Sequence, residues 1–164
     1  MRVYLLRHAI AAERGSAAYA DDDRPLTEEG KAKMSKAAKG LATLIGDIDV
    51  ILTSPLIRAH DTARIAGRAL RAENKVQVCK ELSAGNSLKN LMTYLAKFRS
   101  LNAIMLVGHE PDLGFIASHL LGSDGSIIEF KKGSLCCIEV STLPPRTKGT
   151  LIWHLQPKHL RALA

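Results

Sequence analysis

The sequence predicts an α/β fold in which helices cover both faces of a central sheet. Short apolar runs alternate along the chain with longer segments whose apolar residues recur at the helical period. The run at residues 103–107 is apolar throughout, as is typical of a parallel strand that is buried on both faces. The chain has 164 residues, a length that suits one hydrophobic core, so we expect a single domain that spans residues 1–164.

The short apolar runs are predicted to be strands at residues 3–6, 50–53, 76–78, 103–107, 127–130, 135–140 and 150–155. The longer segments are predicted to be helices that begin near Thr27, after Pro55, near Ser87 and after Pro111. Thr27 is a suitable N-cap, and Glu28 and Glu29 suit the positive first turn of a helix.

The composition is that of an ordinary globular protein with an aliphatic core. Hydrophobic residues make up 46% of the chain, charged residues 24% and aromatic residues only 4%, which weighs against base stacking on a nucleic acid. The formal net charge of +7 suits a nucleic acid, an anionic membrane surface or a phosphorylated partner. The basic residues are dispersed, however, and their densest group is typical of the solvated face of a helix: Lys31, Lys33, Lys36 and Lys39. We therefore expect no nucleic-acid partner.

The cysteines and the hydropathy pattern favour a reducing, cytoplasmic location. Cys79, Cys136 and Cys137 are odd in number and lack the spacing of paired metal ligands. Cys136 and Cys137 are adjacent in an apolar run, where reduced strand residues are expected. The N-terminal apolar run is too short for a signal peptide, and no run approaches the roughly 18 to 20 apolar residues of a membrane span.

Three groups of polar residues each follow a predicted strand, at the point where that strand ends. Arg7 and His8 follow the first strand, residues 54–58 follow the second, and His109 comes shortly after the strand at residues 103–107. In an open α/β sheet, ligands bind beyond the carboxyl ends of the strands. If these strands are neighbours and parallel, two arginines and two histidines meet in one crevice.

Arginine and histidine together suit phosphoryl transfer. Arg7 and Arg58 offer forked donors that stay charged and can hold the oxygens of a phosphoryl group. A neutral imidazole can attack phosphorus, and a second, protonated imidazole stabilises the charge that develops in the transition state. The positive charge of the arginines favours the neutral form of the attacking histidine, and a bound phosphate favours the protonated form of the second histidine. Because these groups supply positive charge, no metal ion or other cofactor is expected.

Each of these residues also has a structural explanation of its own. Arg7 and His8 can be a structural pair at a strand end, His109 can cap a helix, Arg58 can be a surface residue and Ser54 can belong to a turn. Their coincidence at three strand ends is what favours a shared site. The remaining histidines lack metal-ligand spacing and are expected to be structural: His60, His119, His154 and His159. Among them, His60 is near enough to the predicted site to support it.

At these positions the chain resembles the histidine phosphatase superfamily, which includes phosphoglycerate mutases and acid phosphatases. Residues 5–9, Leu-Leu-Arg-His-Ala, resemble the Arg-His-Gly signature of the family. Residues 53–63 resemble its second motif, residues 107–109 its third, and residues 25–30 the usual opening of its first helix. The short length and the Val-Gly-His-Glu-Pro sequence at residues 107–111 resemble the SixA-type phosphohistidine phosphatases.

The resemblance implies a fold, a mechanism and a substrate. The fold is a three-layer α/β/α sandwich with a mixed, mainly parallel central sheet. His8 is implied to be the nucleophile that carries the phosphoryl group, with Arg7, Arg58 and His109 as further catalytic residues. Substrate binding is assigned to Arg7, Arg58, His109 and Ser54. The implied substrate is a phosphohistidine-bearing protein in signal transduction, and no metal ion takes part.

Two departures from the family pattern bear on the mechanism. Ala9 replaces the motif glycine, which leaves this loop intact unless the position requires a positive φ angle. Many members carry an acidic proton donor after the third strand, where this chain has Ala84. An acid assists the departure of an alkoxide by roughly 10²- to 10⁴-fold, so a site without one better suits phosphohistidine. Glu81 is close to this position, but strand alternation is expected to point its side chain away from the site. Glu110 is expected to provide favourable negative charge at a helix N-terminus. Either glutamate could still be a proton donor.

Three other functions stay open at this point. A small-molecule phosphomonoesterase would share the superfamily and the site. A non-catalytic module that binds phosphorylated partners is disfavoured because His8 and His109 are both present. A nucleic-acid-binding protein would require a clustered basic face and salt-dependent binding. The sequence leaves the oligomeric state open.

Overall fold

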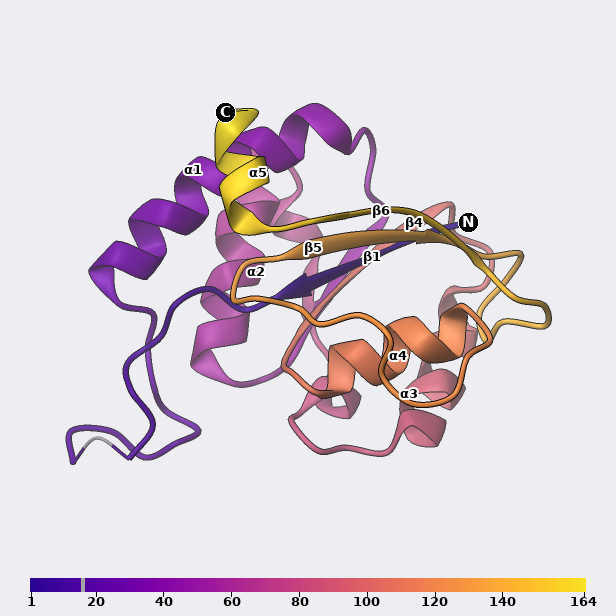
Figure 1. Cartoon of the computed structure of the whole chain (residues 1–164), viewed down its shortest axis with the longest axis horizontal. Coiled ribbons are helices and arrows are strands. Elements are labelled where there is room, and N and C mark those ends of the chain that lie inside the picture. The colour runs from indigo at the N-terminus through magenta and orange to yellow at the C-terminus, as the bar shows by residue number, and fades with distance from the viewer. Residues whose placement is uncertain (16) are drawn as a thin grey trace.

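The computed structural model describes residues 1–15 and 17–164 and contains a six-stranded sheet between two layers of helices (Figure 1). The strands are β1 (Arg2–Arg7), β2 (Val50–Thr53), β3 (Val76–Val78), β4 (Ala103–Gly108), β5 (Leu135–Glu139) and β6 (Thr150–Leu155). They lie in the order β3-β2-β4-β1-β5-β6. The first four strands of this order are parallel, whereas β5 pairs antiparallel with both β1 and β6. The predicted α/β/α sandwich with a mixed, mainly parallel sheet is confirmed.

Two groups of helices cover the two faces of the sheet (Figure 1). One face carries α1 (Glu28–Leu44), α2 (Ile57–Ala69) and α5 (Pro157–Ala162), and the other carries α3 (Leu88–Leu95) and α4 (Asp112–Leu120). Short 3-10 helices are η1 (Glu73–Lys75), η2 (Lys80–Leu82) and η3 (Ala96–Phe98). Successive residues of a strand point to opposite faces, so Leu5 packs with α3 and α4 while Leu6 packs with α1 and α2. The sheet is therefore buried on both sides.

Most predicted elements are confirmed, but one predicted strand is wrong and one helix was missed. Residues 127–130 form no strand; this segment instead runs against α4, where a Cβ on Gly114 would contact the Ile128 carbonyl at 3.0 Å. Helix α5 was not predicted, because its single buried residue, Leu160, gives no periodic apolar signal. Ser87 does occupy the N-cap position of α3, but its side chain makes no capping hydrogen bond.

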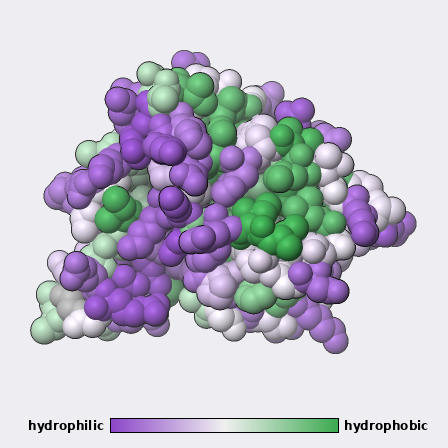
Figure 2. All heavy atoms as spheres, viewed as in Figure 1, coloured by the Kyte–Doolittle hydropathy of each residue, from purple (hydrophilic) through white to green (hydrophobic). Residues whose placement is uncertain are grey.

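The start of α1 agrees with the sequence in detail. Thr27 is the N-cap, its Oγ1 accepts a hydrogen bond from the Gly30 amide at 2.9 Å, and Glu28 and Glu29 occupy the first turn. The long connection between β1 and α1 projects from the body of the molecule at the lower left of Figure 1. In Figure 2 this connection is largely hydrophilic, whereas hydrophobic atoms gather on the other side of the view, over the region of β6 and α4.

The three cysteines all lie in the interior of the protein. Cys79, Cys136 and Cys137 are buried and free, and the adjacent pair lies in β5 as expected. Among the helices of residues 1–15 and 17–164, none combines the length and the apolar character needed to cross a membrane.

Candidate active site

The three polar groups that the sequence places at strand ends do meet, because β4 lies between β1 and β2. The His8 amide donates a hydrogen bond to the Gly108 carbonyl at 3.0 Å. On the other side of β4, the Ser54 amide donates to the Val107 carbonyl, also at 3.0 Å. The carboxyl ends of the three parallel strands are therefore level, and the residues that follow them share one edge of the sheet.

A pocket of about 370 Å³ opens at this edge. We call it the strand-end pocket. Among the described residues its lining includes cationic side chains from three parts of the chain: Arg7, Arg14, Arg24, Arg58 and Lys132. His8, His109 and Ala84 also line it, together with the acidic residues Glu13 and Glu110. The excess of cationic side chains favours an anionic ligand.

His8 is held as a neutral imidazole with one defined tautomer. Its Nδ1 lies 2.8 Å from the Ala9 carbonyl oxygen, which can only accept, so Nδ1 carries the proton. The lone pair therefore resides on Nε2. Burial, together with the neighbouring His109, Arg58 and Arg7, lowers the pKa of His8 to about 3. The neutral form of His8, which the sequence analysis expects, is thus favoured more by burial than by the arginines.

The loop after His8 is fixed by helix α2. The Ala9 amide donates to Thr62 Oγ1 at 3.0 Å, and that hydroxyl in turn donates to the Arg58 carbonyl at 2.7 Å. Ala9 does not need the conformational freedom of the motif glycine, because Arg71 is the only non-glycine residue of the described chain with a positive φ angle. The departure at position 9 therefore leaves the loop intact.

Helix α1 supports the same loop from the opposite side. Because Gly30 has no Cβ, which would collide with the Ile10 carbonyl oxygen, the first turn of α1 can lie directly against the loop. The same carbonyl accepts a hydrogen bond from the Thr27 amide at 3.1 Å. The Pro-Leu-Thr-Glu-Glu-Gly sequence at residues 25–30 thus positions the loop after His8 as well as starting a helix.

His109 lies beside His8 and is supported by Ser54. The two imidazole ring centroids are 5.2 Å apart, and the ring planes meet at 51°. His109 Nε2 lies 2.8 Å from Ser54 Oγ. Ser54 itself is fully buried and is absent from the pocket lining, and its hydroxyl contacts His109 and the Leu56 amide instead. Burial, followed by Arg58, Arg7 and Arg24, lowers the pKa of His109 to about 4.

Arg7 and Arg58 are each anchored at one nitrogen by a backbone carbonyl. Arg7 Nη1 donates to the Phe130 carbonyl, and Arg58 Nη1 donates to the Asp21 carbonyl at 2.9 Å. Arg7 is half-buried, whereas Arg58 is only 2% exposed, which is unusual for an arginine. Each guanidinium is thereby fixed in orientation while part of its donor fork stays available.

Three buried nitrogens of this site have no hydrogen-bond partner within the described part of the protein. They are Arg7 Nε, Arg58 Nε and His109 Nδ1. A buried donor that stays unpaired costs roughly 1 to 3 kcal/mol. An oxyanion in the strand-end pocket would recover this free energy by accepting hydrogen bonds, which makes the three nitrogens a candidate oxyanion site.

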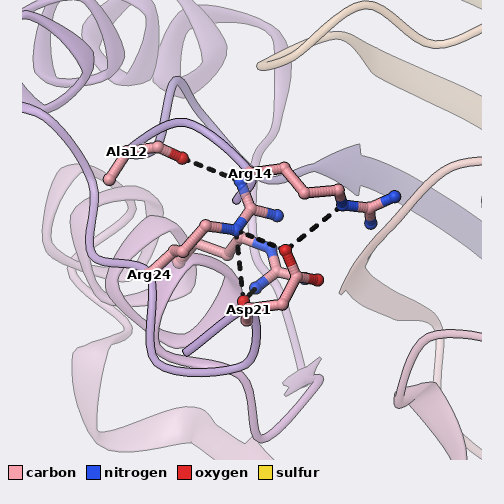
Figure 3. Close-up of polar contacts among 5 residues, drawn as sticks. Ala12, Arg14, Asp21 and Arg24 are labelled. Carbon is pink, nitrogen blue, oxygen red and sulfur yellow. Dashed lines mark hydrogen bonds and ion pairs between the residues drawn. The ribbon is translucent and has the colours of Figure 1, made fainter. Parts of the chain in front are cut away.

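The connection between β1 and α1 adds two arginines that the sequence analysis missed (Figure 3). Arg24 Nε pairs with the Asp21 carboxylate at 2.9 Å, and its Nη1 donates to the Ala12 carbonyl at 2.8 Å. Arg14 Nε reaches the same carboxylate at 3.2 Å. The Asp21 carbonyl also holds Arg58, so Asp21 joins this connection to α2. Arg24 immediately precedes the residue 25–30 motif, which was the only available signal for it.

Comparisons with known proteins agree with the phosphate-binding character of this pocket. The family model of the histidine phosphatase superfamily (branch 1) matches residues 3–86. The chain belongs to the histidine phosphatase superfamily. An uncharacterised protein of Picosynechococcus is 37% identical over 98% of this chain and 99% of its own length. The phosphohistidine phosphatase SixA of Escherichia coli K12 is 25% identical over 98% of this chain and 97% of its own.

Solved structures show the same fold. A protein histidine phosphatase SixA complexed with tungstate superimposes with a TM-score of 0.85 at 24% identity, over 98% of this chain and 99% of that one. A structure described as a putative α-ribazole-5′-phosphate phosphatase from Escherichia coli K-12 has a TM-score of 0.72 at 20% identity, over 96% and 98% of the two chains. The fold is therefore shared by SixA and by phosphatases of small molecules.

Ala84, where the sequence analysis notes the absence of an acid, is exposed and lines the strand-end pocket. Glu81 lies in η2 and not in a strand, and it lines a different hollow. Glu81 therefore lies away from the strand-end pocket, as expected. Strand alternation is not the reason, because Glu81 does not lie in a strand. Cys79 Sγ donates to its carboxylate at 3.4 Å.

Glu110 lies in the strand-end pocket but serves the surrounding backbone. One carboxylate oxygen accepts from the Phe130 amide at 3.1 Å, and the other accepts from the Gly114 amide at 3.3 Å. Because the Phe130 carbonyl anchors Arg7, Glu110 helps to position that arginine. Burial raises the pKa of Glu110, which keeps it as the alternative proton donor in this pocket.

The other histidines stay outside the site. His60 is half-buried on α2 and does not line the strand-end pocket. His119, His154 and His159 likewise lie elsewhere. Within residues 1–15 and 17–164, no group of three or more metal-ligating side chains occurs.

We expect the ligand-free protein to lose stability as the pH falls below about 6.5. His8 and His109 have folded-state pKa values of about 3 and about 4, whereas the unfolded chain titrates near about 6.5. Between these values the unfolded state binds more protons. The stabilisation from neutral imidazoles is therefore complete above about pH 6.5 and declines as the pH falls towards 4 and 3. Urea midpoints between about pH 4.5 and 7.5 measure this decline.

The His8→Asn variant should show a shallower dependence on pH than the wild type, because one of the two titrating groups is removed. His119→Asn is the matched control, since His119 is exposed on α4. An unchanged slope in His8→Asn would contradict the proposed protonation state of His8.

Proposed function

We propose that this chain is a phosphohistidine phosphatase that works through a covalent phosphohistidine intermediate on His8, without a metal ion. The observation that carries the proposal is the set of unpaired nitrogens of Arg7, Arg58 and His109 around the neutral His8. Such a set can bind three phosphoryl oxygens while Nε2 of His8 attacks phosphorus. The relatives named SixA are phosphohistidine phosphatases by name, and one is complexed with tungstate, an oxyanion.

The reaction has two steps. In the first, Nε2 of His8 forms a bond to phosphorus, the substrate N–P bond breaks, and the substrate imidazole, protonated on its other nitrogen, departs as neutral imidazole. In the second, the oxygen of a water molecule forms a bond to phosphorus, the N–P bond to His8 breaks and returns its electron pair to Nε2, and both protons of the water leave with inorganic phosphate. His109 becomes protonated when phosphate is bound and stabilises the developing charge. The cationic side chains of the pocket supply the charge for which other phosphatases use metal ions.

A specific observation favours a second candidate, a small-molecule phosphomonoesterase. Glu110 lines the strand-end pocket, and burial raises the pKa of its carboxyl, so it can be protonated more readily than an exposed glutamate. An alkoxide leaving group would need that proton. Against this, both oxygens of Glu110 accept backbone hydrogen bonds, which favour the charged form.

We expect the wild type to prefer a phosphohistidine peptide over a phosphoserine peptide by about 10²-fold or more in kcat/KM. The reason is the alanine at position 84, which cannot protonate an alkoxide. Ala84→Glu should raise phosphoserine hydrolysis relative to phosphohistidine hydrolysis, and the fold should tolerate it because Ala84 is exposed. Ala84→Gln is the matched control of similar size without an acid.

Efficient hydrolysis of phosphoserine by the wild type, abolished by Glu110→Gln, would instead establish the monoesterase. Tight binding of phosphorylated peptides without turnover would establish a binding module. In the first of these cases the nucleophilic role of His8 would still stand, because it does not depend on the leaving group.

A further inference from the structure

A second hollow adjoins the strand-end pocket and shares His109 with it. Its volume is about 270 Å³, and it lies between α4 and the segment that runs from η2 into α3. We call it the α3–α4 groove. Its walls are mainly apolar and comprise Leu82, Leu88, Leu91, Leu113, Phe115 and Ile116. The groove is therefore unlike the cationic strand-end pocket beside it.

The groove extends from His109 towards the β3 edge of the sheet, away from β1 and His8. Across the sheet, His8 follows β1, His109 follows the central β4, and residues 81–88 follow β3 at the far edge. The attacking and leaving atoms of a phosphoryl transfer lie roughly in line, so the leaving group departs opposite His8. Ala84 lines the strand-end pocket on that side, and its neighbour Ser83 lines the groove.

The groove is held open by contacts within the protein. The Asp112 carboxylate on α4 accepts a hydrogen bond from the Gly85 amide at 2.8 Å. Asn86 Nδ2 donates to the Lys80 carbonyl at 3.1 Å, which fixes the same loop to η2. A preformed apolar groove loses little conformational freedom when a ligand enters.

We propose that the α3–α4 groove binds apolar side chains next to the phosphohistidine of a protein substrate. The inference rests on the proposed function and names what determines specificity at the same site. The two hollows meet at His109, so a ligand fills both only if it extends beyond the phosphoryl group and its imidazole. A polypeptide around a phosphohistidine has this extent. Phe115 is 44% exposed and offers a large apolar surface to such a neighbour.

The test uses two phosphohistidine peptides of equal length and charge, with either leucine or serine on both sides of the phosphohistidine. The wild type should prefer the leucine peptide about tenfold in kcat/KM, mainly through KM, because one apolar side chain leaves water. Phe115→Ala removes part of the groove wall and should reduce this preference to about twofold. Ser87→Trp fills the groove from its rim and should do the same, and Ser87 makes no capping hydrogen bond that the change would lose.

The matched control is Leu151→Ala on β6, which removes an apolar side chain that is 43% exposed and lies outside the groove. It should keep the tenfold preference. Equal hydrolysis of the two peptides by the wild type, or a preference that survives in both groove variants, would overturn the inference while leaving the phosphohistidine phosphatase intact. Failure of the wild type to hydrolyse either peptide would overturn the proposed function, and the groove inference with it.

Discussion

Replacement of His8 by alanine is expected to lower turnover by at least about 10⁴-fold and to abolish labelling of the protein by a phosphorylated substrate. The imidazole supplies the only atom that the mechanism uses as an acceptor, Nε2, and its Nδ1 hydrogen bond to Ala9 defines which nitrogen that is. Neither Arg7 nor Arg58 can replace it, because a guanidinium stays protonated and has no lone pair to offer. Steady-state rates and retention of radioactive phosphate on the denatured protein measure the two effects.

The intermediate can be identified by its chemistry. A phosphohistidine is lost in acid and survives in base, so the label on the wild type should be acid-labile. His60→Ala is the matched control, since His60 follows closely after Arg58 on α2 but does not line the strand-end pocket. Turnover in His8→Ala close to that of the wild type, or a label that survives acid, would remove His8 from the mechanism. Thermal unfolding of each variant shows whether the fold is retained.

The sequence located the centre of the site because the residues involved directly follow strands. A strand buried on both faces is easy to recognise, and the residue after its carboxyl end has only one edge of the sheet at which to lie. Arg7, His8 and His109 were therefore placed correctly by topology alone. Arg58 was placed by the same topology, as part of the segment that follows the second strand. The structure explains its motif through Thr62, which joins α2 to the loop after His8.

The rim of the site could not be predicted in the same way. Arg14, Arg24 and Lys132 reach the strand-end pocket from irregular segments, whose path depends on tertiary contacts such as the Asp21 ion pairs. No periodicity marks such contacts in advance. The same reason explains the wrong strand at residues 127–130, where an irregular backbone buries Phe130 fully and Ile128 partly.

Ser54 shows a different limit of sequence reasoning. Its motif implied contact with substrate, but the structure places it behind His109, to which its hydroxyl is hydrogen-bonded. Sequence order reveals that a residue is near a site without revealing on which side of a functional group it lies. Its contribution is thus to orient the His109 ring, whose Nδ1 is left unpaired.

Arg58→Lys is expected to lower kcat/KM by about 10²-fold, although it preserves the charge. Arg58 serves two partners at once: Nη1 holds the Asp21 carbonyl, and the buried Nε is available to an oxyanion. Lysine offers one ammonium group, which can reach either partner but cannot reproduce the planar fork that serves both. If it pairs with Asp21, the substrate loses a donor, and if it turns to the substrate, the connection that carries Arg24 loses its tie to α2.

Arg64→Lys on the same helix is the matched control. Arg64 is exposed and pairs with Glu73 at 3.1 Å, so the same chemical change there should alter kcat/KM less than twofold, as exposed ion pairs contribute little. Thermal unfolding of both variants separates a lost fold from a lost donor. Because Arg58 is 2% exposed, a small loss of stability is expected for Arg58→Lys, but the folded protein should remain in large excess. Activity of Arg58→Lys within about threefold of the wild type would show that the charge alone suffices and that the fork geometry does not contribute to catalysis.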